Sequence, residues 1–378
     1  MIHIRQTITA ILLAAATCAT QAQYQTITDS NGKKMEIYIP IAEEEDTKDE
    51  VIFTDDKFYQ QQGNYGYFKD YAASETETDA ISRQIKRLPG SMPMTYNEEV
   101  KKYIDRYVKA GRKSTSCLLA RAKYYNHFFE EALRTYGLPL ELKHLPVIES
   151  GLDPNATSRV GAAGLWQFMT VTGREYDLCI NSYIDERRDP VKSSDAAARL
   201  LSDLYRRFGD WNLALAAYNC GSGRVQNAIE RAGGNNDFWE IYQYLPKETR
   251  GYVPAFIAAN YVMTYSGDYD IYPEPTGLPQ KPGKVQITKD VSFAKVANLL
   301  NMEVDELKKL NPQFRQGIIK VTNGNATLLL PSEQVARFNS CSPLLYEDPQ
   351  PTDNTQPSMA ANTNNLPQQE LTQINTAY

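Results

Sequence analysis

The chain has 378 residues, more than one compact core of ordinary size and enough for a catalytic domain with a smaller module. Its formal net charge is −6 at pH 7. A nucleic-acid-binding protein normally concentrates positive charge, so this balance excludes DNA or RNA as the main partner.

Residues 1–22 have the pattern of a secretory signal peptide. Arg5 precedes an apolar run that is too short to span a bilayer, and small residues follow up to Ala22. We expect cleavage after Ala22, while Cys18 offers the alternative of a lipid anchor, and the sequence leaves both open. We therefore expect an exported protein, in the periplasm or at the outer membrane. Export permits disulfides, but the cysteine spacing fixes no pairing.

The next segment, 23–90, is acidic and dotted with tyrosines, and we expect a partly disordered lead-in. From residue 91 apolar residues recur at spacings of three and four, which is typical of amphipathic helices. Residues 91–270 are therefore expected to form a mainly α domain. Its later helices are predicted at 196–208, preceded by Ser193-Ser194-Asp195, and at 211–218 and 254–265.

Proline and glycine mark 271–283 as a linker. Residues 284–338 then show a strand, two helices and a second strand, which predicts a small βααβ module of the α+β class. The tail, 339–378, is rich in Asn, Gln, Thr and Pro and is expected to be disordered.

Glu149 is the candidate catalytic residue. It follows an apolar run, Leu145-Pro146-Val147-Ile148, and precedes small turn-forming residues, so its carboxyl is expected at the wall of a cleft. Breaking a glycosidic bond requires a proton on the leaving oxygen, and a glutamic acid supplies it near neutral pH when burial raises its pKa.

A hydrolase would usually need a second carboxylate, as nucleophile or to activate water. Asp153, Asp177, Asp185 and Glu186 are available, but none lies in a motif that singles it out.

One acid suffices if the sugar supplies its own nucleophile, because a well-placed intramolecular hydroxyl has an effective molarity of about 10⁵ M or more. N-acetylmuramic acid (MurNAc) carries such a hydroxyl at C6. Its attack on the anomeric carbon gives a 1,6-anhydro ring without water. Glu149 would then act first as acid and afterwards as base.

Four motifs carry a resemblance to a known family. Glu149-Ser150, Gly164-Leu165-Trp166-Gln167, Ala217-Tyr218-Asn219 and the stretch from Glu248 to Val253 resemble, in order and spacing, those of the soluble-lytic-transglycosylase family. The flanks Leu138–Leu142 and Asp185–Pro190 resemble its membrane-bound lytic murein transglycosylase D branch.

This resemblance implies a goose-type lysozyme-like α fold and a peptidoglycan lytic exotransglycosylase, a lyase that acts on polysaccharides. It implies cleavage of the β-1,4 bond between MurNAc and N-acetylglucosamine (GlcNAc) in cell wall remodelling and turnover, with peptidoglycan glycan strands as partner. No cofactor is expected, and the scattered His and Cys residues predict no metal site.

The resemblance also assigns roles to single residues. Glu149 matches the family's acid and base, and Ser150 the neighbour that helps to position it. The family usually carries Met where Trp166 stands; we expect Trp166 to lie half in the core and half in the groove wall, with a larger stacking face. The other predicted substrate-binding residues are Gln167 and Met169 along the groove, Tyr218 and Asn219 at the scissile bond, and Tyr252 near the acid.

The second module resembles a LysM domain, which implies glycan binding. Phe293, Val304 and Leu307 fall at core positions, and Asn311 at the loop asparagine. Asn301 replaces the usual glycine between the helices. The sequence leaves two alternatives to a lytic transglycosylase: a muramidase that uses water, and a peptidoglycan-binding protein without catalysis.

Overall fold

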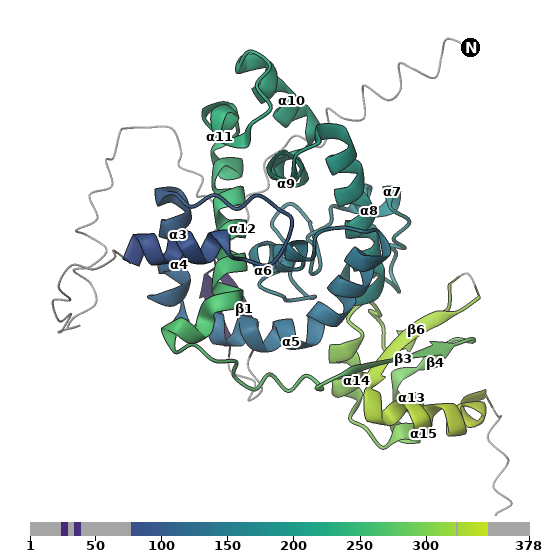
Figure 1. The fold of residues 1–378 in the computed structure, drawn as a ribbon. Helices are drawn as coiled ribbons and strands as arrows, with labels where there is room; N and C mark the ends of the chain where they lie inside the picture. Colours follow the sequence, from purple (N-terminus) through teal and green to yellow (C-terminus); the bar gives the residue numbers. More distant parts are fainter. Residues whose placement is uncertain (1–23, 29–33, 39–76, 323, 347–378) are drawn as a thin grey trace, which may run out of the picture.

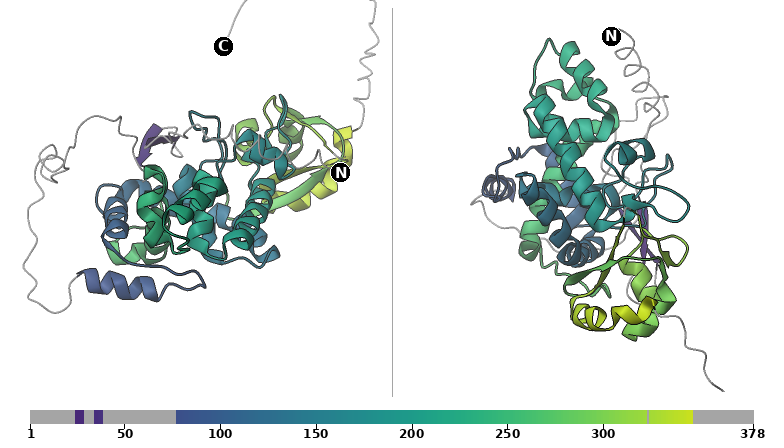
Figure 2. Two further views of the ribbon diagram at one scale, coloured as in Figure 1. Left: turned by 90° about the horizontal axis from the view of Figure 1, so that it is seen from above. Right: turned by 90° about the vertical axis from the view of Figure 1, so that its right-hand side faces the viewer.

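The computed structural model describes residues 24–28, 34–38, 77–322 and 324–346. It has a mainly helical unit, from α3 to η4, and a smaller module with short strands and helices, from β3 to η6 (Figure 1). The module lies at one end of the helical unit in all views (Figure 2). The signal peptide, Cys18 and residues 347–378 of the predicted tail lie outside the described residues.

The helical unit is built from ten α-helices and four short 3₁₀ segments among the described residues. Strands β1 (Tyr24–Thr28) and β2 (Lys34–Tyr38) precede it and pair antiparallel. The helices are α3 (Glu77–Lys86), α4 (Glu98–Val108), α5 (Arg112–Thr135), α6 (Leu145–Ser150), α7 (Thr170–Glu175), α8 (Pro190–Phe208), α9 (Trp211–Cys220), α10 (Ser222–Arg231), α11 (Phe238–Ile241) and α12 (Lys247–Tyr265), with η1 (Leu140–His144), η2 (Glu186–Arg188), η3 (Tyr242–Tyr244) and η4 (Ser266–Tyr269).

Helix α12 forms the centre of this unit. Its residues from Gly251 to Val262 are all buried, and it packs against α4, α6 and α9. A helix that is apolar on every side must be covered by other elements to leave water, which explains its central place. The helix that delivers Glu149, α6, is therefore fixed against the most buried part of the fold.

The second module consists of β3 (Pro282–Ile287), β4 (Val291–Ser292), α13 (Phe293–Leu300), α14 (Val304–Leu310), β5 (Ile318–Ile319), β6 (Ala326–Pro331), η5 (Ser332–Gln334), α15 (Val335–Cys341) and η6 (Ser342–Tyr346). Strands β3 and β6 pair antiparallel, from Pro282 opposite Pro331 to Ile287 opposite Ala326. Asn301 ends α13 with φ = +53°, a left-handed conformation that Asn tolerates better than most residues. The predicted class, mainly α followed by a small α+β module, is confirmed; the βααβ order corresponds to β3, α13, α14 and β6, and the structure adds the short strands β4 and β5 and helix α15.

Several predicted boundaries differ from the structure. Residues 77–86 were expected in a partly disordered lead-in, yet they form α3 and bury Ile81 and Ile85, one turn apart, in the core. Helix α8 begins at Pro190, because the Asp189 side chain accepts hydrogen bonds from two main-chain N–H groups and Pro is favoured at the first helical position.

The other two differences concern helix α12 and the end of the second module. Helix α12 begins at Lys247, so Pro254 lies inside it and not at its start. The ordered module continues beyond residue 338, through α15 to Tyr346, and buries Leu345 in its core.

Candidate active site

Glu149 lies near the end of the short helix α6, in which all six residues are buried. Its exposed fraction is 4%. The helix stops at Gly151, whose φ of +59° gives the left-handed cap that glycine adopts without strain. A polar group in such surroundings is costly unless it is hydrogen-bonded.

Tyr252 of α12 supplies this hydrogen bond. Its hydroxyl donates to Oε1 of Glu149, joining residues that are 103 positions apart in the sequence. Burial and the nearby Glu149 carboxylate raise the pKa of Tyr252 well above its usual value. Tyr252 therefore keeps its proton over the physiological pH range and can donate it in the hydrogen bond.

Ser150 ties α6 to the segment Gly161–Met169, which we name the active-site loop. Its side chain has no exposed surface, and its hydroxyl lies 2.9 Å from the carbonyl oxygen of Leu165 and 3.1 Å from that of Pro146. Because Ser150 follows Glu149 directly, these contacts fix the acid relative to the loop.

Three residues of the active-site loop adopt positive φ angles, Gly161 at +87°, Gly164 at +86° and Gln167 at +50°. A Cβ at Gly164 would lie 1.8 Å from the carbonyl oxygen of Arg187, so only glycine fits there. Gln167 donates from Nε2 to the carbonyl oxygen of Gly164 over 2.9 Å. The loop thus has a compact, internally bonded shape, with Met169 at its end 42% exposed.

Tyr218 and Asn219, at the end of α9, are half-buried beside this loop. The Tyr218 hydroxyl donates to the carbonyl oxygen of Trp166 over 2.8 Å. Burial and Glu149 also raise the pKa of Tyr218, which places this phenol near the acid. Asn219 accepts a hydrogen bond from the Thr249 hydroxyl at 2.9 Å.

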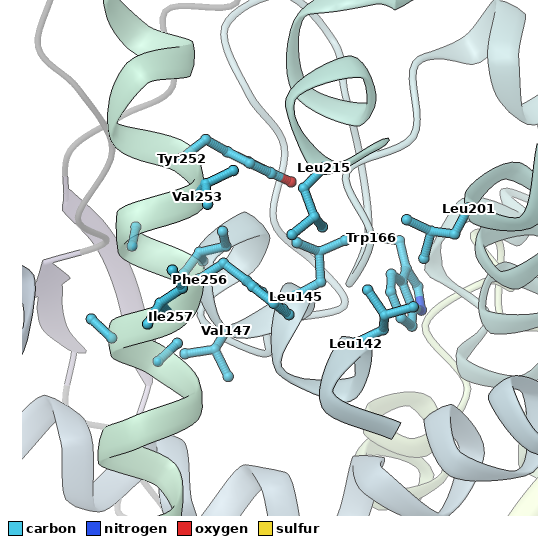
Figure 3. Close-up of a cluster of buried hydrophobic side chains, with 14 of the residues drawn as sticks. Leu142, Leu145, Val147, Trp166, Leu201, Leu215, Tyr252, Val253, Phe256 and Ile257 are labelled. Atoms are coloured by element: carbon cyan, nitrogen blue, oxygen red, sulfur yellow. The ribbon is translucent and has the colours of Figure 1, made fainter. Parts of the chain in front are cut away.

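Trp166 is a core residue, so the expectation that it forms half of a stacking wall is wrong. It is 1% exposed, and its indole N–H donates to the Ser194 hydroxyl at 3.0 Å. Its ring meets that of Phe129 edge to face, with 5.1 Å between the centroids. Figure 3 shows it in the same buried cluster as Leu142 and Leu201.

The four other carboxylates considered for water activation have partners of their own. Asp185 pairs with Arg187 and Arg315, and Glu186 pairs with Lys192. The remaining two lie nearer the surface: Asp177 pairs with Arg199, and Asp153 accepts from the main-chain N–H of Asn155.

Sequence reasoning missed two residues that hold the site together. Thr249, which fixes Asn219, lies within the fourth motif but was not singled out. Arg187 donates from one guanidinium nitrogen to the carbonyl oxygens of Gly161, at 2.7 Å, and Phe168, at 3.2 Å. The signal for Arg187 was the run of charged residues in the Asp185–Pro190 flank, to which the sequence analysis gave no structural role.

The described residues contain no group of three or more His, Cys, Asp or Glu side chains arranged to hold a metal ion. Their four cysteines, Cys117, Cys179, Cys220 and Cys341, are all free thiols. None of the helices in the described part of the chain is long and apolar enough to cross a membrane.

Comparison with known families matches both units. Residues 126–241 match the transglycosylase SLT domain, and residues 281–347 match the LysM-like domain of lytic transglycosylase MltD. The resemblance drawn from the four motifs is therefore confirmed: the helical unit is similar to the SLT domain and the second module to the LysM-like domain of MltD.

Among curated proteins, the chain is 34% identical over 224 residues to membrane-bound lytic murein transglycosylase D of Escherichia coli K12, covering 58% of this chain and 49% of that protein. It is 32% identical over 127 residues to the soluble lytic murein transglycosylase of the same strain, covering 32% and 20%. The chain thus spans about half the length of the transglycosylase D relative and a smaller share of the soluble one.

Among solved structures, the 70 kDa soluble lytic transglycosylase of Escherichia coli is similar with a TM-score of 0.34 and 29% identity, over 40% of this chain and 26% of that one.

Proposed function

We propose that this chain is a peptidoglycan lytic transglycosylase. It cleaves the β-1,4 bond between MurNAc and GlcNAc without water and leaves 1,6-anhydro-MurNAc ends, in cell wall remodelling and turnover. The observation that carries the proposal is the buried carboxyl of Glu149, held by the Tyr252 hydroxyl beside Tyr218. Glu149 and Tyr218 lie within the SLT match, and the relatives are named as lytic murein transglycosylases.

Glu149 acts twice in this mechanism. As an acid, it gives its proton to the leaving GlcNAc oxygen, and the 2-acetamido group of MurNAc supports the developing positive charge. As a carboxylate, it then removes the proton from the C6 hydroxyl, whose oxygen attacks C1 and closes the anhydro ring. The proton returns to Glu149, so no water molecule is consumed.

Tyr252 serves both stages because its hydroxyl donates a hydrogen bond to Oε1 of Glu149. A phenol that keeps its proton stabilises the carboxylate formed after the first step. It also fixes the orientation of the carboxyl at the scissile bond. We assign Tyr252 a positioning and stabilising role.

The other predicted site residues fall into two groups. Ser150 has no exposed surface and binds main-chain oxygens, so we assign it a positioning role in place of a substrate contact. Tyr218 and Asn219 contact the sugar at the scissile bond, while Gln167 and the exposed Met169 line the groove on the loop side.

A water-using muramidase is the rival within enzymes. It needs a second carboxylate to activate water or attack the sugar. The ion pairs of Asp185, Glu186 and Asp177, and the turn contact of Asp153, favour the single-acid mechanism.

The protein is proposed to act after export, in the periplasm or at the outer membrane, on peptidoglycan glycan strands. Glycan binding by the LysM-like module would not use the side chain of Asn311. That side chain is fully buried and bonded to the main chain of Leu307 and Leu329. Binding would involve exposed surfaces of the module.

Mass spectrometry of fragments released from purified peptidoglycan tests the proposal. We expect soluble fragments one water lighter than hydrolysis products with the wild-type protein and none with Glu149→Gln. Glu149-dependent fragments with ordinary reducing ends would favour the muramidase. Binding to insoluble wall material without any release would favour the binding protein.

A further inference from the structure

The LysM-like module and the helical unit share a core contact at Tyr183-Ile184-Asp185. Ile184 belongs to the helical unit, yet it is 1% exposed and lies in the hydrophobic core of the module, bridged to Phe314. The main-chain N–H of Arg315 donates to the carbonyl oxygen of Tyr183, and that of Asp185 donates to the carbonyl oxygen of Gln313, each at 2.9 Å. This pattern resembles strand pairing more than a loose surface contact.

The linker is also held in place. The Ser116 hydroxyl of α5 donates to the carbonyl oxygen of Tyr272 at 2.6 Å, and the N–H of Glu274 donates to the carbonyl oxygen of Ser116. The module is therefore fixed at its linker and at Ile184, and does not hang on a free tether.

Asp185 stands at the centre of the contact with no exposed surface. Arg187 binds it through two nitrogens, at 2.8 and 2.9 Å, and Arg315 of the module approaches from the other side. Although burial raises the pKa of Asp185, the guanidinium groups of Arg187, Arg315 and Arg188 together hold it below its usual value. Asp185 thus orients Arg187 and is itself held by the module.

Arg187 passes this contact on to the active-site loop. One nitrogen of its guanidinium binds the carbonyl oxygens of Gly161 and Phe168, near the two ends of the loop. Its own carbonyl oxygen packs against Gly164, where no side chain would fit. Between these points lie Leu165, whose carbonyl accepts from Ser150, and Trp166, whose carbonyl accepts from Tyr218.

We infer that the LysM-like module positions the active-site loop, and through it Glu149, by the contact series Arg315–Asp185–Arg187. Arg315 is a positioning residue for turnover although it lies in the other module. The inference rests on the proposed function for its effect on turnover. Its effect on the loop itself can be measured without any activity.

Besides the ion pair of Arg315 with Asp185, a second ion pair joins the module to the helical unit and provides a matched control. Lys284 of β3 pairs with Glu131 of α5, and both side chains are partly exposed, at 34% and 62%. Like Arg315, Lys284 is a basic residue that joins the module to the helical unit. Lys284 contacts Glu131 and the ring of Phe128, both in α5 and outside the active-site loop, so its removal tests docking alone.

The experiment compares full-length Arg315→Ala, Arg315→Lys and Lys284→Ala with wild type. Turnover is followed by release of anhydro fragments. Hydrogen exchange is followed by mass spectrometry of peptides covering 156–169. With Arg315→Ala we expect kcat to fall about 3- to 10-fold, KM to stay within about twofold, and loop amides to exchange faster. Arg315→Lys should recover part of kcat, because Lys restores the charge beside Asp185 but not the second guanidinium nitrogen, which donates to the carbonyl oxygen of Asn181. Lys284→Ala should resemble wild type.

The inference would be overturned if Arg315→Ala and Lys284→Ala had the same kcat and the same rate of hydrogen exchange in the loop. A rise in KM alone would also overturn it, because it would indicate loss of glycan binding by the module. If the wild-type protein released no anhydro fragments, the proposed function would fail, while the exchange comparison would still decide whether the module holds the loop.

Discussion

The helical unit and the LysM-like module bury different kinds of polar side chain. Among the described residues, the helical unit buries ionisable groups, including Glu141, Glu149 and Asp185, whereas the buried polar residues of the module are the amides Asn311 and Gln313. Buried ionisable groups cost free energy unless they are paired, and they are the groups that transfer protons.

This difference assigns catalysis to the helical unit and a structural role to the buried amides of the module. In the helical unit, Glu149 is the proposed acid, and the buried pair Asp185 and Arg187 holds the active-site loop. In the module, the buried amide of Asn311 joins α14 to β6 and maintains shape. The comparison predicts that substitutions in the first unit change turnover and pH response, and that those in the core of the second change stability.

The largest effect is expected from Glu149→Gln. Removing the proton donor should lower turnover by about 10²–10⁴-fold, the usual worth of general acid–base catalysis. The matched control is Glu141→Gln, since Glu141 is also buried and its Oε1 accepts from the N–H of Met92, which an amide oxygen can do as well. Both variants should still bind insoluble peptidoglycan in a sedimentation assay. Near-normal turnover in Glu149→Gln would contradict the assignment of the acid.

Tyr252→Phe should lower kcat by about 10- to 100-fold, with little change in KM. A hydrogen bond to a charged group is worth about 1.5–3 kcal/mol, and this one stabilises the carboxylate of Glu149. Tyr261→Phe is the control on the same helix, because the Tyr261 hydroxyl is bonded to Gln84, away from the acid. Equal losses in both variants would mean that α12 packing and not the Glu149 contact is responsible.

Asn311→Ala should destabilise the module by about 2–3 kcal/mol, because it leaves the Leu307 and Leu329 main-chain groups without their side-chain partners. Asn298→Ala, at an exposed position of α13, should change stability by less than about 0.5 kcal/mol. Chemical denaturation with a probe in the module measures both. If Asn311→Ala were as stable as Asn298→Ala, the structural role of the Asn311 amide would be contradicted.

His144 should make the helical unit sensitive to acid. Burial, and then Lys143, lower the pKa of His144 from 6.5 to about 3 in the folded state. Because the folded pKa lies below the unfolded one, the contribution to stability is complete above pH 6.5 and is lost as pH falls toward 3. Between pH 7 and 5 the loss is about 2 kcal/mol.

Replacing His144 with Leu should remove this part of the pH dependence, while replacing the exposed His127 with Gln should leave it unchanged. Unfolding free energies at pH 7 and 5 provide the measurement. The same slope in His144→Leu and wild type would show that other groups cause the acid sensitivity.

Local patterns predicted much of this molecule. The spacing of apolar residues predicted the helices, and Glu149 could be singled out because four motifs occur in order. The contact between Tyr252 and Glu149 was predicted only through the motif order, since no local pattern joins residues 103 positions apart.

Contacts between distant segments explain what the sequence did not predict. The full burial of Trp166 depends on Phe129 of α5 and Ser194 of α8, which lie far from it in the sequence. The place of Asp185 between the modules depends on Arg315, 130 residues later. The Ile81 and Ile85 pair of α3 was visible in the sequence, but two apolar residues one turn apart were too short a pattern to outweigh the acidic composition around them.

The most direct test of the single-acid mechanism is digestion of peptidoglycan in water enriched in ¹⁸O, followed by mass spectrometry of the released fragments. The account predicts 1,6-anhydro ends that contain no ¹⁸O and that disappear with Glu149→Gln, because the attacking oxygen comes from the sugar. Glu149-dependent fragments with one ¹⁸O at the reducing end would contradict it, because water would then be the nucleophile.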